Sequence, residues 1–156
     1  MHVKGPFLLL FSLVFQSCSL IFQSDMIEKN TNYVIQPNGD WIETKSARTD
    51  FLFRHTDQSF FYSNSYCDHF EGKSLENLSK EHIQKFDNYK VVKQVRYTSP
   101  RESLYSLVKL PKDKRKVFFH HLGFYVDNCY YDLTLIEQGK IRHTDDFFNF
   151  YQRGQF

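Results

Sequence analysis

The sequence predicts an α+β fold in which a largely antiparallel sheet packs against a central helix and a C-terminal helix. Three observations lead to this prediction. Apolar residues recur with the period of a helix over residues 74–86, they alternate with the period of a strand between residues 91 and 137, and residues 144–151 combine an acidic start with an apolar face. We therefore expect strands, a helix, four strands and a helix, all within a single α+β domain over residues 33–156.

Two short hairpins are expected before the central helix. Residues 33–42 place two apolar pieces around an Asn-Gly pair, which is a typical turn sequence. Residues 51–53 and 60–62 are rich in aromatic side chains and flank the polar segment 55–58. This pattern predicts a second hairpin with its turn in that polar segment.

The central helix is expected to begin at Ser74, because a serine side chain can accept a hydrogen bond from the first turn. Its apolar side is formed at helical spacing by Leu75, Leu78, His82, Ile83 and Phe86. We expect this side to pack against the sheet.

The remaining elements follow from a change of period. Alternation predicts strands over 91–97, 103–110, 117–127 and 129–137, with turns at 111–115 and 127–128. Pro100 closes the first of these strands. The last helix opens with Thr144-Asp145-Asp146, where carboxylates favour the helix dipole, and its apolar face is formed by Phe147, Phe148, Phe150 and Tyr151.

The first 17 residues have the features of a signal peptide. A short start with one lysine precedes an apolar block over 7–15, too short for the roughly 20 residues of a membrane-spanning helix. The alternatives are a core helix or a retained anchor. The pair Ser17-Cys18 resembles the end of a bacterial lipoprotein signal, although Phe15 and Gln16 depart from its usual residues.

We therefore expect Cys18 to carry lipid, with residues 18–32 as a polar tether and the membrane as a partner through that lipid. Several acyl chains give a stable anchor, whereas a single chain binds a bilayer only marginally. Ser19 follows the cysteine where an aspartate is associated with inner-membrane retention, so the outer membrane is favoured over the inner. Ordinary cleavage near Cys18, which would give a secreted protein without lipid, is the alternative.

The composition excludes some functions. The formal net charge is +2, and loss of Lys4 with the signal peptide would leave +1, which is too balanced for a nucleic-acid-binding surface. The densest basic run, residues 109–116, contains a Pro and an Asp and is expected to be a solvated turn. No phosphate-binding loop or zinc-site spacing is present, so we expect no cofactor and no metal.

The chain has three cysteines, an odd number that needs an explanation in an exported protein. If Cys18 carries lipid, Cys67 and Cys129 remain and can form a disulfide in an oxidising compartment. The alternative is two separate buried thiols.

Candidates for chemistry are few. Cys67 and His69 would share one face of an extended segment, which would suit a metal site or an activated thiolate. His120 and His121 are adjacent on a predicted strand and should point to opposite faces. Asp132 is an acid within an apolar run; it is either an outward-facing or strand-end carboxylate, or a polar group lining a cleft between sheet and helix.

The segment "NCYYDL" at residues 128–133 resembles the Cys-x-Tyr-Asp-Leu strand of a family of small, uncharacterised lipoproteins of Gram-negative envelopes. The resemblance extends over about residues 33–156, and the overall pattern is similar to PsbP-type α/β/α sandwiches. The usual Gly-rich turn before the cysteine strand is Asp127-Asn128 here. The resemblance implies a sandwich fold similar to that of PsbP-type proteins and a location in the cell envelope.

Two functions are compatible with these observations. One is a non-enzymatic envelope lipoprotein, a binding or accessory module facing the periplasm or cell surface, whose partner is an envelope protein or a small apolar ligand. The other is a lipid-anchored enzyme in which Cys67, His69 and Asp132 converge. Common hydrolase motifs are absent from the sequence, which favours the first.

Overall fold

The computed structural model describes residues 32–37, 39–67, 72–112 and 115–156. The predicted signal peptide, Cys18, most of the predicted tether and His69 lie outside these residues. Within them, neither helix is long and apolar enough to cross a membrane.

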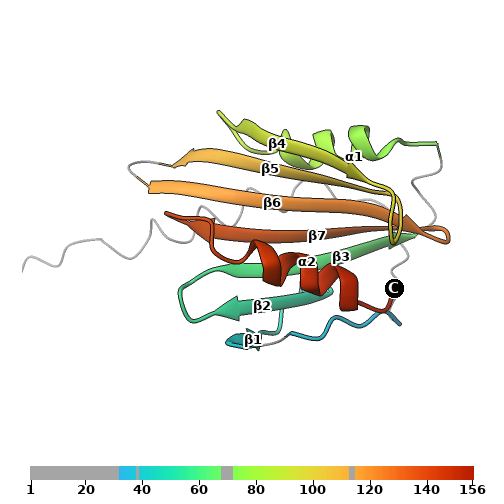
Figure 1. Cartoon of the computed structure of the whole chain (residues 1–156), viewed down its shortest axis with the longest axis horizontal. Coiled ribbons are helices and arrows are strands. Elements are labelled where there is room, and N and C mark those ends of the chain that lie inside the picture. The colour runs from blue at the N-terminus through green and yellow to red at the C-terminus, as the bar shows by residue number, and fades with distance from the viewer. Residues whose placement is uncertain (1–31, 38, 68–71, 113–114) are drawn as a thin grey trace, which may run out of the picture.

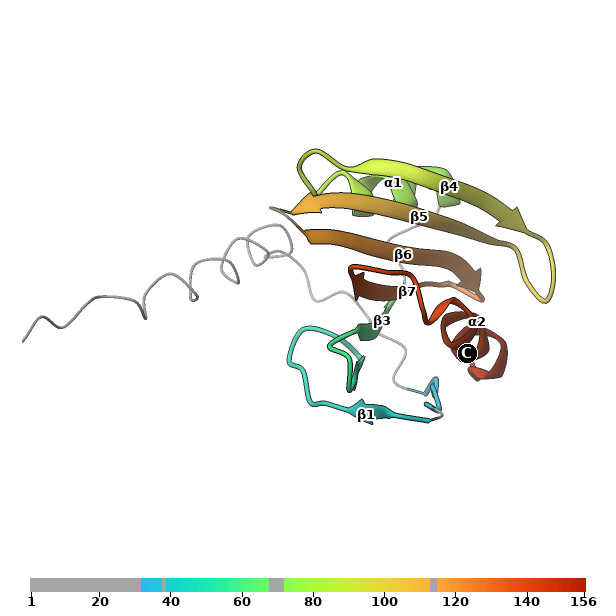
Figure 2. The same ribbon diagram turned by 60° about the vertical axis from the view of Figure 1, so that its left-hand side comes forward.

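The described domain is built on one antiparallel sheet with a helix on each face, which confirms the α+β class (Figures 1 and 2). Its elements in chain order are β1 (Trp41–Glu43), β2 (Phe51–His55), β3 (Phe60–Cys67), α1 (Leu75–Ile83), β4 (Lys90–Tyr97), β5 (Ser103–Lys112), β6 (Arg115–Val126), β7 (Cys129–Gln138) and α2 (Thr144–Arg153). The strand order is β1-β2-β3-β7-β6-β5-β4. After β3 the chain passes through α1 to the far edge of the sheet, and then returns strand by strand until β7 pairs with β3.

The strand predictions from residue 51 onward are confirmed. β2 and β3 form the expected hairpin, and β5, β6 and β7 form two long ones. The ladder between β5 and β6 extends further than predicted, because Pro111 pairs with Lys116 and Lys112 pairs with Arg115. Residues expected to form a turn therefore lengthen both strands.

The predicted hairpin over residues 33–42 is wrong. Val34 forms an isolated bridge with Gln155 beyond the end of α2, and β1, the one strand among the described residues of this region, pairs with β2 instead. Tyr33 and Ile35 are buried in the core, and the Tyr33 hydroxyl lies 2.9 Å from Ser63 Oγ on β3. These tertiary contacts outweigh the local turn signal.

Helix α1 begins where predicted, because the Ser74 side chain accepts a hydrogen bond from the backbone of Asn77 at 3.2 Å. Its apolar side covers one face of the sheet. Leu75 and Leu78 pack with Leu104 and Tyr130, and further along, Ile83 packs with Val108 and Phe119.

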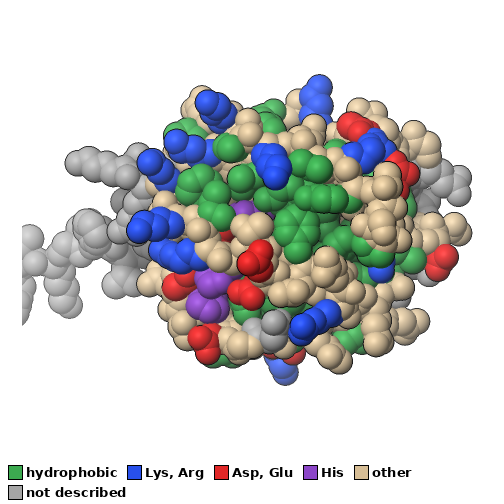
Figure 3. All heavy atoms as spheres, viewed as in Figure 1, with side chains coloured by type: hydrophobic (Ala, Val, Ile, Leu, Met, Phe, Trp, Pro, Cys, Tyr) green, Lys and Arg blue, Asp and Glu red, His purple; other side chains and the backbone are tan. Residues whose placement is uncertain are grey.

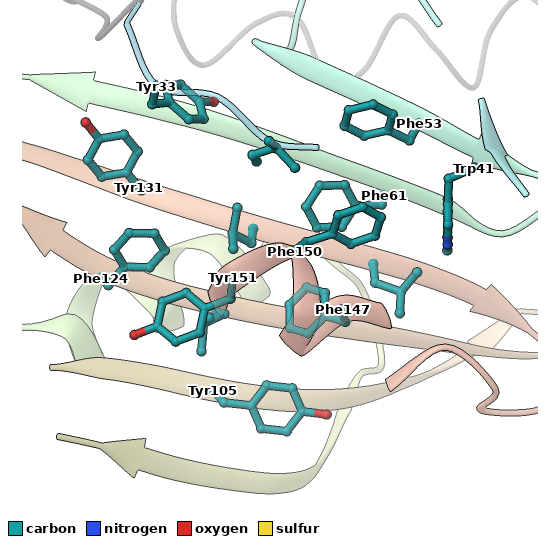
Figure 4. Close-up of a cluster of buried hydrophobic side chains, with 14 of the residues drawn as sticks. Tyr33, Trp41, Phe53, Phe61, Tyr105, Phe124, Tyr131, Phe147, Phe150 and Tyr151 are labelled. Carbon is teal, nitrogen blue, oxygen red and sulfur yellow. The ribbon is translucent and has the colours of Figure 1, made fainter. Parts of the chain in front are cut away.

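Helix α2 covers the opposite face, where the larger core lies (Figure 4). The aromatic side chains of this core come from the segment before β1, from six strands and from α2: Tyr33, Trp41, Phe53, Phe61, Tyr105, Phe124, Tyr131, Phe147, Phe150 and Tyr151. Phe150 is stacked on Phe61 with ring centroids 4.2 Å apart. The high aromatic content of the sequence is thus concentrated beneath α2.

Candidate functional site

Cys67 and Cys129 form a disulfide, as predicted, and the alternative of two separate thiols is wrong. The two residues lie directly opposite each other at the ends of β3 and β7, with α-carbons 4.0 Å apart. This separation is shorter than the roughly 4.4–6.8 Å usual for disulfides. Because its sulfur is bonded, Cys67 offers no thiolate as nucleophile or metal ligand.

Asp132 lies in the middle of β7 and is 1% exposed, so the prediction of an outward-facing or strand-end carboxylate is wrong. Its Oδ1 accepts a hydrogen bond from Asn64 Nδ2 at 3.4 Å, and its Oδ2 lies 3.9 Å from His82 Nδ1 on α1. Asp132 therefore occupies the space between sheet and helix.

Cys129 and Asp132 lie on the same strand, but an odd number of positions separates them, so their side chains point to opposite faces of the sheet. Cys129 packs on the α2 side, and its disulfide partner Cys67 lies on that side with it. Cys67 and Asp132 consequently lie on opposite faces and do not converge.

Further polar side chains gather around Asp132 beneath α1. Ser79 Oγ lies 3.1 Å from Ser106 Oγ and 3.4 Å from His121 Nδ1, and His121 Nε2 lies 3.4 Å from the Tyr130 hydroxyl. The rings of His82 and His121 are stacked with centroids 4.7 Å apart.

Burial controls the ionisation of this group. It raises the pKa of Asp132 to about 7, and it lowers the pKa of His82 to about 3 and that of His121 well below its usual range. The two imidazoles are therefore neutral. Ser79, His121 and Asp132 belong to residue types used in catalysis, but each is at most 1% exposed, so a substrate has no access to them.

His120 points to the opposite face from His121, as predicted. Its Nδ1 lies 2.9 Å from the Tyr105 hydroxyl and its Nε2 lies 2.8 Å from Glu137 Oε2, and the side chains of His120 and Glu137 are fully buried. The second oxygen of Glu137 accepts hydrogen bonds from the backbone of Arg142 at 2.7 Å and of His143 at 2.9 Å. This buried series of contacts, from Tyr105 through His120 to Glu137, fixes the backbone that leads into α2.

His143 completes a cluster at the surface, which we call the histidine cluster: His55, Asp57 and His143. Asp57 lies in the turn between β2 and β3 and uses both oxygens, with Oδ1 2.9 Å from His55 Nδ1 and Oδ2 2.9 Å from His143 Nε2. The ring centroids of the two histidines are 4.2 Å apart. The three side chains are 13–26% exposed, so the cluster is open to solvent on one side. Figure 3 shows histidine side chains at the surface beside carboxylates.

Three neighbours hold the histidine cluster. Asp146 Oδ2 lies 3.0 Å from His143 Nδ1 and 3.3 Å from Trp41 Nε1, and Arg142 donates to Asp57 Oδ2 at 2.7 Å. Partial burial lowers the pKa of His143, but its bonds to Asp57 and Asp146 outweigh this and raise it overall. Desolvation raises the pKa of Asp57, but its hydrogen bonds with His143, Ser59 and His55 outweigh this and hold that pKa well below its usual range.

Sequence reasoning missed the histidine cluster, because Asp57 and His143 are separated by 86 positions. The only local signal is a His-x-Asp pair in a predicted turn. The expectation of no metal site rested on the spacing of cysteines and histidines, which does not detect ligands brought together by the sheet.

A second surface feature lies on the α2 side of β4, β5 and β6. We call it the apolar strip, and it consists of Val95, Tyr97, Leu107, Phe118 and Phe148. Leu107 is buried, whereas the other four side chains remain partly exposed. The Phe148 ring packs edge-on against Tyr97 with centroids 5.7 Å apart. Figure 3 shows hydrophobic side chains gathered over this part of the sheet, with lysine and arginine side chains mainly to the left of and above them and acidic side chains below and at the upper right.

Lysines border the apolar strip. Lys93 lies opposite Leu107 in the ladder and Lys109 lies opposite Phe118, so these lysines lie on the same side of the sheet as the strip. Lys90 and Lys116 extend the basic border, as partners of Lys109 and Pro111.

No family model matches the chain. No curated protein matches it either. Among solved structures, it is similar to LpqN, described as involved in cell envelope biogenesis of Mycobacterium tuberculosis, with a TM-score of 0.53, 10% sequence identity and coverage of 85% of this chain and 86% of that chain. At this identity the similarity concerns the fold. The predicted PsbP-like arrangement and the resemblance to the Gram-negative lipoproteins stay predictions.

Proposed function

We propose that the chain is a lipid-anchored module of the bacterial cell envelope, without catalytic activity, that binds another envelope protein through the apolar strip. The Cys67–Cys129 disulfide supports export, because disulfides persist in oxidising compartments. Ser17-Cys18 supports a lipid anchor at the mature N-terminus. The fold shared with LpqN, whose description refers to cell envelope biogenesis, is compatible with this location.

The observation that carries the binding role is the partial exposure of the strip's aromatic side chains. An apolar centre with aromatic residues inside a polar rim is the usual composition of a protein–protein interface. The catalytic alternative is less well supported, because Cys67 is bonded and Asp132 is covered by α1.

The shape and charge of the strip favour a protein partner over a small apolar ligand. Small-molecule sites are concave and enclose most of the ligand. The apolar strip lies instead on the face of a sheet beside α2, and four of its five residues are partly exposed to solvent. The lysine border favours a partner whose own apolar surface is rimmed by Asp and Glu.

The proposal is tested by site-specific photo-crosslinking in bacterial cells that produce the full chain. A photoreactive residue at Val95 should give one discrete adduct with an envelope protein, and charge reversal with Lys93→Glu and Lys109→Glu should weaken that adduct at least tenfold. The same photoreactive residue at Ile42, which is 64% exposed on β1, is the matched control and should give none. Equal labelling from Val95 and Ile42, or an adduct indifferent to charge reversal, would contradict the proposal.

A further inference from the structure

The histidine cluster offers the ligand set of a zinc site. Two imidazoles and one carboxylate each present a ligand atom, and these atoms lie within 4.8 Å of one another. Nitrogen and oxygen ligands of this kind bind Zn²⁺, and sites with three protein ligands keep a fourth position for water or another ligand.

We propose that His55, Asp57 and His143 bind one Zn²⁺ ion, with the fourth position open to solvent. This inference stands independently of the proposed partner binding, because the histidine cluster and the apolar strip share no residue.

The ligand atoms need a local rearrangement to accept the ion. Ligand atoms at about 2.0–2.1 Å from a tetrahedral Zn²⁺ are about 3.3 Å from one another. Asp57 contacts the two histidines at 2.9 Å through different oxygens, whereas one ligand atom from each of the three residues lies within 4.8 Å of the others, so the most distant pair would approach when the ion binds. The ion would replace the protons that these contacts now share.

The surroundings of His143 match those of a metal-bound histidine. Its other ring nitrogen, Nδ1, lies 3.0 Å from the Asp146 carboxylate, which also accepts a hydrogen bond from Trp41 Nε1. A carboxylate on the second nitrogen is the usual companion of a zinc-binding imidazole, since it fixes the ring and increases its basicity. The backbone amide of His143 is held by buried Glu137 at 2.9 Å.

Two contacts oppose the ion. The backbone amide of Asp57 donates to His55 Nδ1 at 3.3 Å, so the ion would displace this hydrogen bond. The Arg142 guanidinium donates to Asp57 Oδ2 at 2.7 Å and brings a positive charge to the cluster. Its side chain is 44% exposed, and it can therefore turn into solvent when the ion binds. Removal of this charge should strengthen zinc binding, whereas it should weaken a cluster that serves only as a set of ion pairs.

Trp41 provides an internal reporter. It is the single tryptophan of the chain, and its ring centroid lies 5.1 Å from that of His55 and 5.3 Å from that of His143. Its fluorescence can be followed during titration of the purified, metal-stripped full chain with ZnCl₂. Metal analysis after gel filtration gives the stoichiometry.

We expect one zinc per chain in the wild type. His55→Gln and His143→Gln should each weaken binding at least tenfold, Asp146→Asn should weaken it 10- to 100-fold, and Arg142→Ala should strengthen it. His82→Gln, on the other face of the sheet, is the matched control and should bind zinc like the wild type. Cooperative unfolding of each variant, with the disulfide intact, shows that the fold is retained. If one of the two histidine variants does not fold, zinc binding by the other histidine variant tests the proposal.

Absence of stoichiometric zinc in the folded wild type would overturn the proposal. Binding that survives in His55→Gln and His143→Gln would overturn it as well, because the ion would then lie elsewhere. Weaker binding in Arg142→Ala would also count against it.

Discussion

Glu137 and His120 lie in contact in the interior of the protein, with Oε2 and Nε2 2.8 Å apart and both side chains fully buried beneath α2. Removal of one partner leaves the polar atoms of the other buried without it, which costs about 1–3 kcal/mol, and more where the remaining group is charged. We therefore expect His120→Phe to lower the free energy of unfolding by about this amount in urea denaturation. The double variant with Glu137→Gln should lose less than the sum of the single variants, and additive losses would show that the pair is not coupled.

The pH dependence of stability should carry a contribution from Asp132. Since its pKa is about 7 in the folded state and about 3.9 in the unfolded chain, the folded state binds more protons between these values. Stability from this group is therefore fully present below about pH 4 and is lost as the pH rises through 7. The groups that act on it are His82 and Lys85 from the α1 segment, and Asn64, Tyr66 and Asp50 from the β2–β3 side.

Asp132→Asn should remove this dependence. At pH 8 the variant should be more stable than the wild type by up to about 4 kcal/mol, and at pH 4 the two should converge. Asp87→Asn, at an exposed carboxylate, is the control and should stay within about 0.5 kcal/mol of the wild type at both pH values. Urea midpoints at pH 4 and pH 8 provide the measurement. A variant that is less stable than the wild type at pH 8 would show that the buried carboxylate is stabilising when ionised.

The Cys67–Cys129 disulfide closes a loop with a sequence separation of 62 residues. In the chain-entropy model such a link stabilises the fold by about 4 kcal/mol. Reduction should therefore lower the urea midpoint of the wild type, and it should have no effect on a Cys67→Ala/Cys129→Ala double variant. Thiol counting on denatured, unreduced protein should find neither cysteine free.

Leu78 is 4% exposed where α1 meets the sheet. Leu78→Ala should lower the free energy of unfolding by about 2–5 kcal/mol, the range for a buried leucine. Lys80→Ala, at an exposed position of the same helix, should change it by less than about 0.5 kcal/mol. A similar small effect at Leu78 would mean that the helix is not docked as described.

Cys18 is predicted to be the mature, lipid-carrying N-terminus. Cys18→Ala should leave the signal peptide uncleaved or move the protein out of the detergent phase in a phase-partition experiment. Intact mass of the wild type should exceed that of the chain from residue 18 by the mass of the acyl groups. Processing and partition that are the same in wild type and variant would favour ordinary cleavage and a secreted protein.

The sequence predicted those elements whose periodicity is long and whose partners are close in the chain. The three strands from residue 103 to residue 138 follow one another through hairpins, so the alternation of apolar and polar residues was sufficient to predict them. Tyr33 was assigned to a local hairpin because its contacts with Ser63 and with residues near the C-terminus are not visible in a local pattern. The local sequence left open whether Asp132 is exposed or lies between sheet and helix, because alternation gives the face of a strand but does not say what covers that face. The histidine cluster depends on the register of β2 with β3 and on the docking of α2, neither of which the local sequence contains.

The bridge between Val34 and Gln155, with both backbone hydrogen bonds at 2.9–3.0 Å, brings the two ends of the described domain together. A fusion partner or affinity tag placed after Phe156 would therefore lie beside the start of the described domain. For the same reason, a short linker could join Phe156 to residue 32, and new termini could be opened in the β5–β6 turn. Such a circular permutant would keep every pair of the sheet except the outermost rungs of that hairpin, while presenting a tag at the opposite end of the long strands from residues 32 and 156.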